Sequence, residues 1–430
     1  MNSSSPASTD RLRILWLRVG GCQVQHNGGA VYSYHLMKHL MAHCQVHVLE
    51  SHKVADEGGS ETVSYAHKRE CVFSQFMEEW APRRLFSFLW PIARNLFASR
   101  EPFSLTMFHS ESFARRAREL EQSGRFDLII ADGLYVAPVF ASWKGPRTTP
   151  VILLQHNVEA LIWKRLSELQ RHPFMRLFFN EMARRMKRRE PELCGLFDGV
   201  TTISYEDGIY HRDIYRLPNI LGCVPAGANP DARGLPPAVL EQTAAPCIAF
   251  LGTMNWPPNA DAAFWFIEKM LPVIRQTMPE VRFRVIGRDP PEALKRLAAA
   301  DKGIEVTGKV EEVVTPLREC AMLVVPLRAG SGVRLKILQA MAAGVPVVST
   351  SVGAEGLHVR DGHEIVLADD ASALSDAAVR LLNDSSLRRT LAANALQRVT
   401  NDYSWNRSAE ILAGYGAELH HRKMTCVNAA

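Results

Sequence analysis

The chain of 430 residues contains 47% hydrophobic and 22% charged residues and carries a formal net charge of +5. These values exclude a disordered chain, and the length exceeds what one ordinary core supports, so we expect a soluble protein of two domains. Eight cysteines without CxxC spacing exclude a disulfide framework or a cysteine metal site and indicate a reduced, cytoplasmic compartment. The polar start predicts no signal peptide, and no apolar run reaches the roughly 18 residues of a membrane-spanning helix.

Apolar segments of strand length alternate with helical patterns along most of the chain. In the first half we expect strands at 13–19, 46–49, 127–131, 151–155 and 198–204, with a glycine-containing loop and a helix over 30–42 after the first. A proline- and alanine-rich stretch without periodicity follows, at 224–246. The alternation then restarts, with strands expected at 247–252, 282–287, 304–307, 321–327, 345–350 and 364–367.

Two successive β/α series joined by an irregular linker predict an α/β fold of two facing, doubly wound domains. We place them at residues 1–235 and 236–430, with the final helix packing back on the N-terminal domain. Ligands of such sheets bind at the carboxyl ends of the strands, so the interdomain cleft is the expected site.

Basic residues gather in the N-terminal half, where residues 83–118 hold seven arginines and two glutamates. The segment 83–100, RRLFSFLWPIARNLFASR, alternates arginines with large aromatic residues. Two interpretations remain open. The segment is either a solvated face over ordinary core aromatics, or a surface that contacts an anionic membrane in a salt-sensitive way.

The segment 329–350 reads AGSGVRLKILQAMAAGVPVVST. A buried strand, four small residues, and a helix over 333–343 that stops at Gly344 are expected here. The exposed N–H groups of the helix N-terminus would face an anion.

Several other site classes do not fit the sequence. The third glycine of a dinucleotide GxGxxG motif would fall at Leu335, and Walker, HExxH and GxSxG motifs are missing. Asp369-Asp370 lacks the carboxylate spacing of a metal-dependent sugar transferase, and the fifteen histidines form no cluster. We therefore expect no metal and no cofactor.

In this order the segments resemble the family 4 (group 1) glycosyltransferases, and among them a bacterial exopolysaccharide-type branch. The resemblance runs from residue 13 to about 415 and is strongest over 330–357, GSGVRLKILQAMAAGVPVVSTSVGAEGL. It is supported by LGTMNWPPNADAAFWF (251–266), VTGKV (306–310), HNVEALIWKR (156–165), NGGA (27–30) and YSW (403–405). The resemblance implies the GT-B fold, in which two Rossmann-like domains face each other.

The resemblance also implies a nucleotide sugar in the C-terminal domain, with its diphosphate at the N-terminus of the helix expected over 333–343. Backbone groups of Ser331, Gly332 and Val333 would contact phosphate oxygens, and Lys336 or Arg334 would supply positive charge.

Further site residues follow from the same resemblance. Gly28 and Gly29 would let the backbone approach the donor or acceptor, and Glu355 would contact the sugar hydroxyls. His156 matches the active-site histidine of the family, while Asn157 and Glu159 would orient it or meet the acceptor.

Two positions depart from the pattern of the family, which often has two glutamates eight residues apart. Here the positions are Ser331 and Gln339. The later glutamate holds the ribose hydroxyls, and an amide accepts through one oxygen only, which costs on the order of 1 kcal/mol per hydrogen bond.

The sequence thus predicts a cytoplasmic, metal-independent, retaining hexosyltransferase for cell-surface or exopolysaccharide synthesis. Its partners would be a nucleotide-sugar donor, a glycan or lipid-linked acceptor and an anionic membrane surface, with no nucleic acid. The alternatives are a degenerate, non-catalytic nucleotide-sugar binder or assembly partner, and a nucleotide-sugar 2-epimerase.

Overall fold

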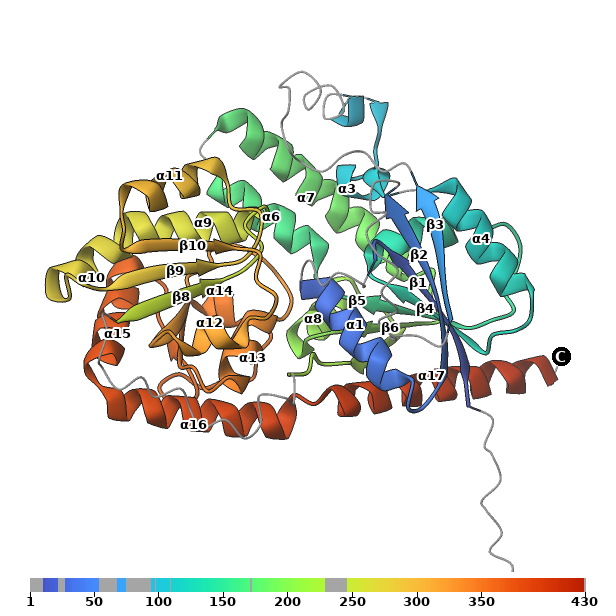
Figure 1. Cartoon of the computed structure of the whole chain (residues 1–430). Coiled ribbons are helices and arrows are strands. Elements are labelled where there is room, and N and C mark those ends of the chain that lie inside the picture. Colours follow the sequence, from blue (N-terminus) through green and yellow to red (C-terminus); the bar gives the residue numbers. More distant parts are fainter. Residues whose placement is uncertain are drawn as a thin grey trace, which may run out of the picture.

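The chain folds into two α/β domains that lie side by side (Figure 1). Three features named in the sequence lie outside the part of the chain that is described: the domain boundary expected at 235/236, residue 27, and most of the arginine–aromatic segment 83–100. The computed structural model describes residues 11–21, 28–53, 68–74, 94–96, 98–108, 110–170, 172–228 and 246–428.

The N-terminal domain contains a parallel sheet in the order β3-β2-β1-β4-β5-β6-β7. Its strands are β1 (Arg13–Val19), β2 (Gln45–Lys53), β3 (Lys68–Ser74), β4 (Leu128–Asp132), β5 (Val151–Gln155), β6 (Gly199–Thr202) and β7 (Ile220–Cys223). The described helical segments are α1 (Gly28–Leu40), α3 (Phe103–Met107), α4 (Glu111–Gln122), η1 (Leu134–Val136), α5 (Ala137–Ala141), α6 (Glu159–Leu169), α7 (Pro173–Cys194), α8 (Tyr205–Ile209) and η2 (Tyr210–Ile214).

The C-terminal domain contains a second parallel sheet, in the order β10-β9-β8-β11-β12-β13. Its strands are β8 (Cys247–Leu251), β9 (Arg282–Ile286), β10 (Ile304–Gly308), β11 (Met322–Val325), β12 (Val347–Ser349) and β13 (Val366–Leu367). Its helical segments are α9 (Pro257–Trp265), η4 (Phe266–Met270), α10 (Leu271–Thr277), α11 (Glu292–Ala300), α12 (Val314–Arg318), α13 (Leu335–Ala342), α14 (Ser351–Ala354), α15 (Ala371–Asn383) and α16 (Ser385–Asp402).

Every strand expected from the sequence is present, and the two-domain α/β fold is confirmed. Strands β1, β4, β5, β8 and β11 are apolar almost throughout because helices cover both faces of a parallel sheet. The sequence analysis missed β3 and β7, which are the two edge strands of the N-terminal sheet. Edge strands are less buried, so they lack the continuous apolar run on which the prediction depended.

The end of the N-terminal domain at 225–228 touches the segment in which the chain returns from the C-terminal domain. The Ala228 amide donates to the Tyr403 carbonyl at 2.9 Å, and the Ser408 hydroxyl donates to the Pro225 carbonyl at 2.6 Å. The indole of Trp405 packs directly against the backbone of Gly227. The two described segments are therefore bonded to each other where the domains meet.

The last helix, α17 (Trp405–Asn428), leaves the C-terminal domain and runs along the N-terminal domain (Figure 1). It packs on α1 and on the start of β4, where Nδ1 of His420 lies 3.1 Å from the Asp127 carbonyl oxygen. Gly416 faces the fully buried side chain of Leu128. None of the described helices combines the length and the apolar character needed to cross a membrane.

Two glycines of α17 allow its docking to be tested. A Cβ at Gly416 would lie 2.6 Å from Cδ2 of Leu128, whereas a Cβ at Gly414 would meet no atom within 4 Å. Each Gly→Ala change should raise the free energy of unfolding by about 0.5–1 kcal/mol, because alanine favours the helix more than glycine does. Only Gly416→Ala also crowds the contact with Leu128, which should lower the free energy of unfolding by about 1–3 kcal/mol. In urea unfolding we expect Gly414→Ala to be stabilised and Gly416→Ala destabilised relative to the wild type. Equal stability of the two variants would contradict the docking.

Candidate active site between the domains

The glycine loop before α13 contacts the N-terminal domain backbone to backbone. Gly332 has a φ of 77°, and a Cβ there would lie 2.6 Å from the His156 carbonyl oxygen and 2.5 Å from the Asn157 side-chain amide. Only glycine fits both the conformation and the contact. The residue places the start of α13 against the loop that follows β5.

Hydrogen bonds reinforce this contact. The Val158 amide donates to Ser331 Oγ at 3.1 Å, and Ser331 Oγ lies 3.5 Å from Asp207 Oδ1. With the Asn157 amide assigned so that its nitrogen faces the two carbonyls, it donates to Ser331 and His156 at 3.0 Å each. The side chain of Ser331 thus stands between the domains, and its role here is to join them.

The helix α13 starts at Leu335, two residues later than the sequence predicted, and Arg334 is its N-cap residue. The positive φ of Gly332 and the non-helical angles of Arg334, φ −90° and ψ 87°, delay the helix. The Arg334 guanidinium therefore folds back on its own loop and donates to the carbonyls of Ser331 and Gly332, the latter at 2.7 Å. Burial lowers the pKa of Arg334 to about 10.

Lys336 lies in the first turn of α13. Its Nζ donates to Asn259 Oδ1 at 2.7 Å and sits 4.7 Å from the ring centroid of Phe250. Burial, with a smaller effect of the neighbouring Arg334 charge, lowers the pKa of Lys336 to about 7. The ammonium group is therefore poorly compensated here, and a nearby anion would restore its charge.

Two helix N-termini face each other across the domain boundary. A Cβ at Gly28, the first residue of α1, would lie 3.8 Å from Cδ1 of Leu335, the first residue of α13. Gly29 follows Gly28 in the first turn of α1. The partial positive charges of both helix ends add at this point, which favours an anion between them.

Gln339 and Val333 flank this point on the C-terminal side. The Gln339 side chain is partly exposed, one turn along α13 from Leu335, and makes no hydrogen bond to a described residue. Val333 is also partly exposed, and its Cγ2 lies close to Gly356. The Gln339 amide is thus available to a ligand.

On the N-terminal side, His156 follows β5 and is held by Asp132, the last residue of β4. The distance from His156 Nε2 to Asp132 Oδ1 is 2.7 Å, and Arg18 and Trp16 donate to Asp132 Oδ2 at 2.7 and 2.9 Å. Although burial opposes it, the charges of Arg18 and His156 hold the pKa of Asp132 well below its usual value. An ionised Asp132 accepts from Nε2–H of His156, and Nδ1 of the ring makes no hydrogen bond to a described residue.

Glu159, expected to orient His156 or meet the acceptor, turns instead into a buried network. Its carboxylate accepts from the Tyr135 hydroxyl at 2.9 Å, and burial together with the charge of Glu190 raises its pKa to about 7. Glu190 accepts from the amides of Glu159 and Ala160 at 3.0 and 3.1 Å and so satisfies the start of α6.

Glu355, expected at the sugar hydroxyls, is paired with Arg165 of α6. Arg165 Nη1 donates to Glu355 Oε2 at 2.5 Å, and Nη2 donates to Oε1 at 2.7 Å. Arg165 Nη1 also donates to the carbonyl of Gly330. The pair joins α6 of the N-terminal domain to the C-terminal domain.

The structure thus brings His156, Asn157, Ser331, Gly332, Gly28 and Leu335 together, while Glu159 and Arg334 point away from the shared space. The sequence analysis missed Asp132 and Arg165. Asp132 ends a buried strand that adjoins β5, which was a usable signal, whereas nothing in the pattern singled out Arg165. Among the described residues, no three His, Cys, Asp or Glu side chains are grouped so as to hold a metal ion.

Most of the C-terminal domain matches a known family model. Residues 245–384 match the family model described as Glycosyl transferases group 1. The chain is 21% identical over 348 residues to an uncharacterized 44.6 kDa protein of the cps region of Klebsiella pneumoniae, which covers 79% of this chain and 86% of that protein. It is 27% identical over 199 residues to the phosphatidyl-myo-inositol mannosyltransferase of Mycobacterium leprae, a match that spans 45% of this chain and only 50% of that enzyme.

Solved structures superpose on nearly the whole chain. Sucrose-phosphate synthase from Thermosynechococcus elongatus superposes with a TM-score of 0.66 at 19% identity, covering 96% of this chain and 100% of that one. Anabaena Alr3699/HepE in complex with UDP-glucose gives 0.63 at 13% identity, covering 98% and 100%. Residues 245–384 are thus similar to the group 1 glycosyltransferases, and over both domains the chain has the GT-B fold.

Proposed function

We propose that the protein transfers a sugar from a nucleoside diphosphate sugar to a glycan or lipid-linked acceptor, with retention and without a metal ion, in bacterial cell-surface or exopolysaccharide synthesis. The observation that carries the proposal is the meeting of the N-termini of α1 and α13 across the domains, with Lys336 beside it. The UDP-glucose complex of HepE and the cps-region relative support the donor class and the pathway class.

In the proposed reaction, the bond between the anomeric carbon and the diphosphate oxygen breaks while the acceptor oxygen bonds to that carbon. The acceptor proton passes to the departing diphosphate. The N–H groups at the start of α13 and the ammonium of Lys336 stabilise the charge that grows on the diphosphate. His156 Nδ1, oriented through Asp132, accepts a hydrogen bond from a hydroxyl of the transferred sugar.

A panel of UDP- and GDP-sugars with glycan acceptors tests the proposal. We expect release of the nucleoside diphosphate together with a glycosylated product whose anomeric configuration, read by NMR, matches that of the donor. Turnover should survive excess EDTA. Binding of a nucleotide sugar without turnover would favour a non-catalytic binder, the alternative suggested by Ser331 and Gln339.

Lys336→Ala should lower the rate of transfer at least tenfold, because it removes an ammonium group from the first turn of α13. Lys269→Ala, an exposed lysine of the same domain, is the matched control and should transfer at the wild-type rate. Circular dichroism verifies the fold of both variants. Wild-type turnover in Lys336→Ala would show that Lys336 does not contribute to transfer.

Binding of UDP should take up a proton above about pH 7. The pKa of Lys336 is about 7 in the free protein, and a bound diphosphate raises it, so the complex holds one more proton in the window between the two values. Affinity should therefore fall as the pH rises through that window. Calorimetry near pH 8 in buffers of different ionisation enthalpy measures the uptake, and Lys336→Met should abolish it.

Substitution of Gln339 tests whether α13 holds the ribose. Gln339→Glu should tighten UDP binding by about 1 kcal/mol, because a carboxylate accepts from both ribose hydroxyls with the help of its charge. Gln339→Leu should weaken UDP binding, because a leucine side chain accepts no hydrogen bond from either ribose hydroxyl. Identical affinities across the three proteins would show that residue 339 does not touch the nucleotide.

A further inference from the structure

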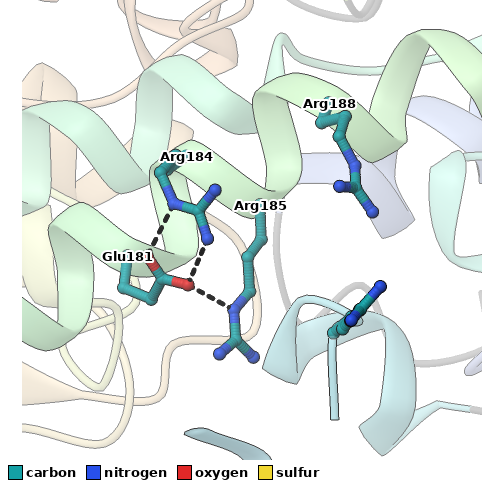
Figure 2. A pocket seen from close by; sticks show the side chains of 5 residues that line it. Glu181, Arg184, Arg185 and Arg188 are labelled. Carbon is teal, nitrogen blue, oxygen red and sulfur yellow. Dashed lines mark hydrogen bonds and ion pairs between the residues drawn. The ribbon is translucent and has the colours of Figure 1, made fainter.

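A hollow lined by arginines lies outside the interdomain site, where α7 meets the segment 98–103. Its volume is about 160 Å³, roughly ten times the space that one water molecule needs. Four guanidinium groups and one carboxylate surround it: Arg100, Arg184, Arg185, Arg188 and Glu181 (Figure 2). None of these residues takes part in the proposed transfer.

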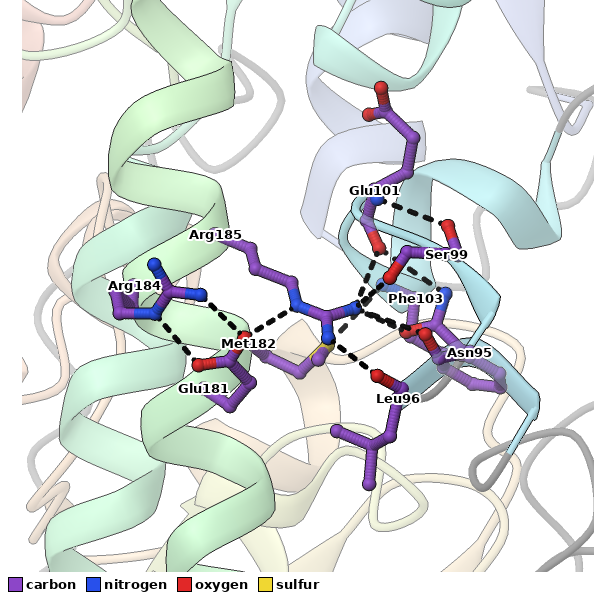
Figure 3. A network of polar contacts seen from close by, with 9 residues as sticks. All are labelled: Asn95, Leu96, Ser99, Glu101, Phe103, Glu181, Met182, Arg184 and Arg185. Atoms are coloured by element: carbon purple, nitrogen blue, oxygen red, sulfur yellow. Dashed lines mark hydrogen bonds and ion pairs between the residues drawn. The ribbon is translucent and has the colours of Figure 1, made fainter.

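Arg185 builds one wall of the hollow. Its guanidinium donates to the carbonyls of Asn95, Leu96 and Ser99 at 3.1, 3.0 and 2.8 Å, and its Nε donates to Glu181 at 2.7 Å (Figure 3). These bonds tie the backbone of the segment before Arg100 to α7. Arg185 is a buried structural group, and it holds Arg100 beside the outer face of the helix.

The other arginines remain accessible. The side chains of Arg184 and Arg188 are 70% and 67% exposed, and the ion pair of Arg188 with Glu192 is long, at 3.9 Å. Arg100 is exposed and makes no ion pair or hydrogen bond to a described residue. Hydrogen bonds from Arg184 and Arg185 lower the pKa of Glu181 to about 2, so one carboxylate stays ionised among the four cations.

The same face of α7 carries exposed apolar side chains. Phe174 and Leu177 are 47% and 68% exposed, and the steps from 174 to 177, 181, 184 and 188 alternate between three and four residues. That spacing keeps all five positions on one side of a helix. This side of α7 is apolar toward the N-terminal end of the helix and cationic beside the hollow.

We propose that this face of α7 docks on an anionic lipid membrane, with a lipid phosphate in the arginine hollow and Phe174 and Leu177 at the level of the acyl chains. Charge complementarity selects this occupant: a phosphate layer neutralises the clustered guanidinium groups, and the adjoining apolar side chains bury in the interface. Docking through α7 goes beyond the proposed transfer, because it requires neither donor nor acceptor.

Co-sedimentation of the full chain with vesicles tests the docking without any nucleotide or sugar. We expect binding to phosphatidylcholine vesicles containing about 30 mol% phosphatidylglycerol, weaker binding at high salt and little binding to phosphatidylcholine alone. The triple variant Arg100→Gln, Arg184→Gln, Arg188→Gln should lower the partition coefficient at least tenfold. Leu177→Ser with Phe174→Ser should lower it as well, at unchanged net charge.

A control variant removes the same charge elsewhere. Arg407 and Arg422 of α17 are 72% and 65% exposed and pair with glutamates within their helix, as Arg184 does, and Arg389 of α16 is exposed. Arg389→Gln with Arg407→Gln and Arg422→Gln should keep the wild-type partition within about twofold, and so should Lys336→Ala. Equal losses in the two triple variants, or equal binding of the wild type to neutral and anionic vesicles, would overturn the docking.

Discussion

The backbone of the C-terminal domain passes Gly332 at a distance from the loop after β5 that leaves no room for a side chain. Much of the site depends on this close approach. It sets the start of α13 opposite the start of α1, brings Ser331 within reach of the Val158 amide, and aligns Gly330 with Arg165. A larger residue at 332 would separate the domains and would dilute the combined field of the two helix ends, which falls off within a turn.

The electrostatics of the cleft are divided between the domains. On the N-terminal side the buried carboxylate of Asp132 is fully compensated by Arg18, Ser33, Trp16 and His156, which fixes the imidazole. On the C-terminal side two cations stand near a helix N-terminus, where the helix dipole disfavours them. Arg334 is satisfied by carbonyls of its own loop, and Lys336 has a single amide oxygen and a ring face. This imbalance indicates a site shaped for a ligand that brings negative charge with it.

The sequence predicted those parts of the fold in which local pattern and burial agree. Strands such as β5 and β11 are continuous apolar runs and were located within two residues, whereas the edge strands β3 and β7 carry no such run. The glycine loop and His156 were found because each directly follows a buried strand. The orientation of Glu159 and the pairing of Glu355 with Arg165 depend on side chains far apart in the chain, and no local pattern encodes them. The helix starts two residues later than its apolar periodicity indicates, which places Arg334 at the N-cap with its guanidinium on its own loop.

The two bonded segments where the domains meet constrain how the cleft opens. A body attached by a single linker can twist in any direction, but here the segment at Pro225 and Ala228 is bonded to the start of α17, and α17 packs along the N-terminal domain. These contacts would restrict rotation of the C-terminal domain relative to the N-terminal domain. The Arg165–Glu355 pair and the Gly332 contact lie across the same boundary, so any separation of the two domains there would have to break both.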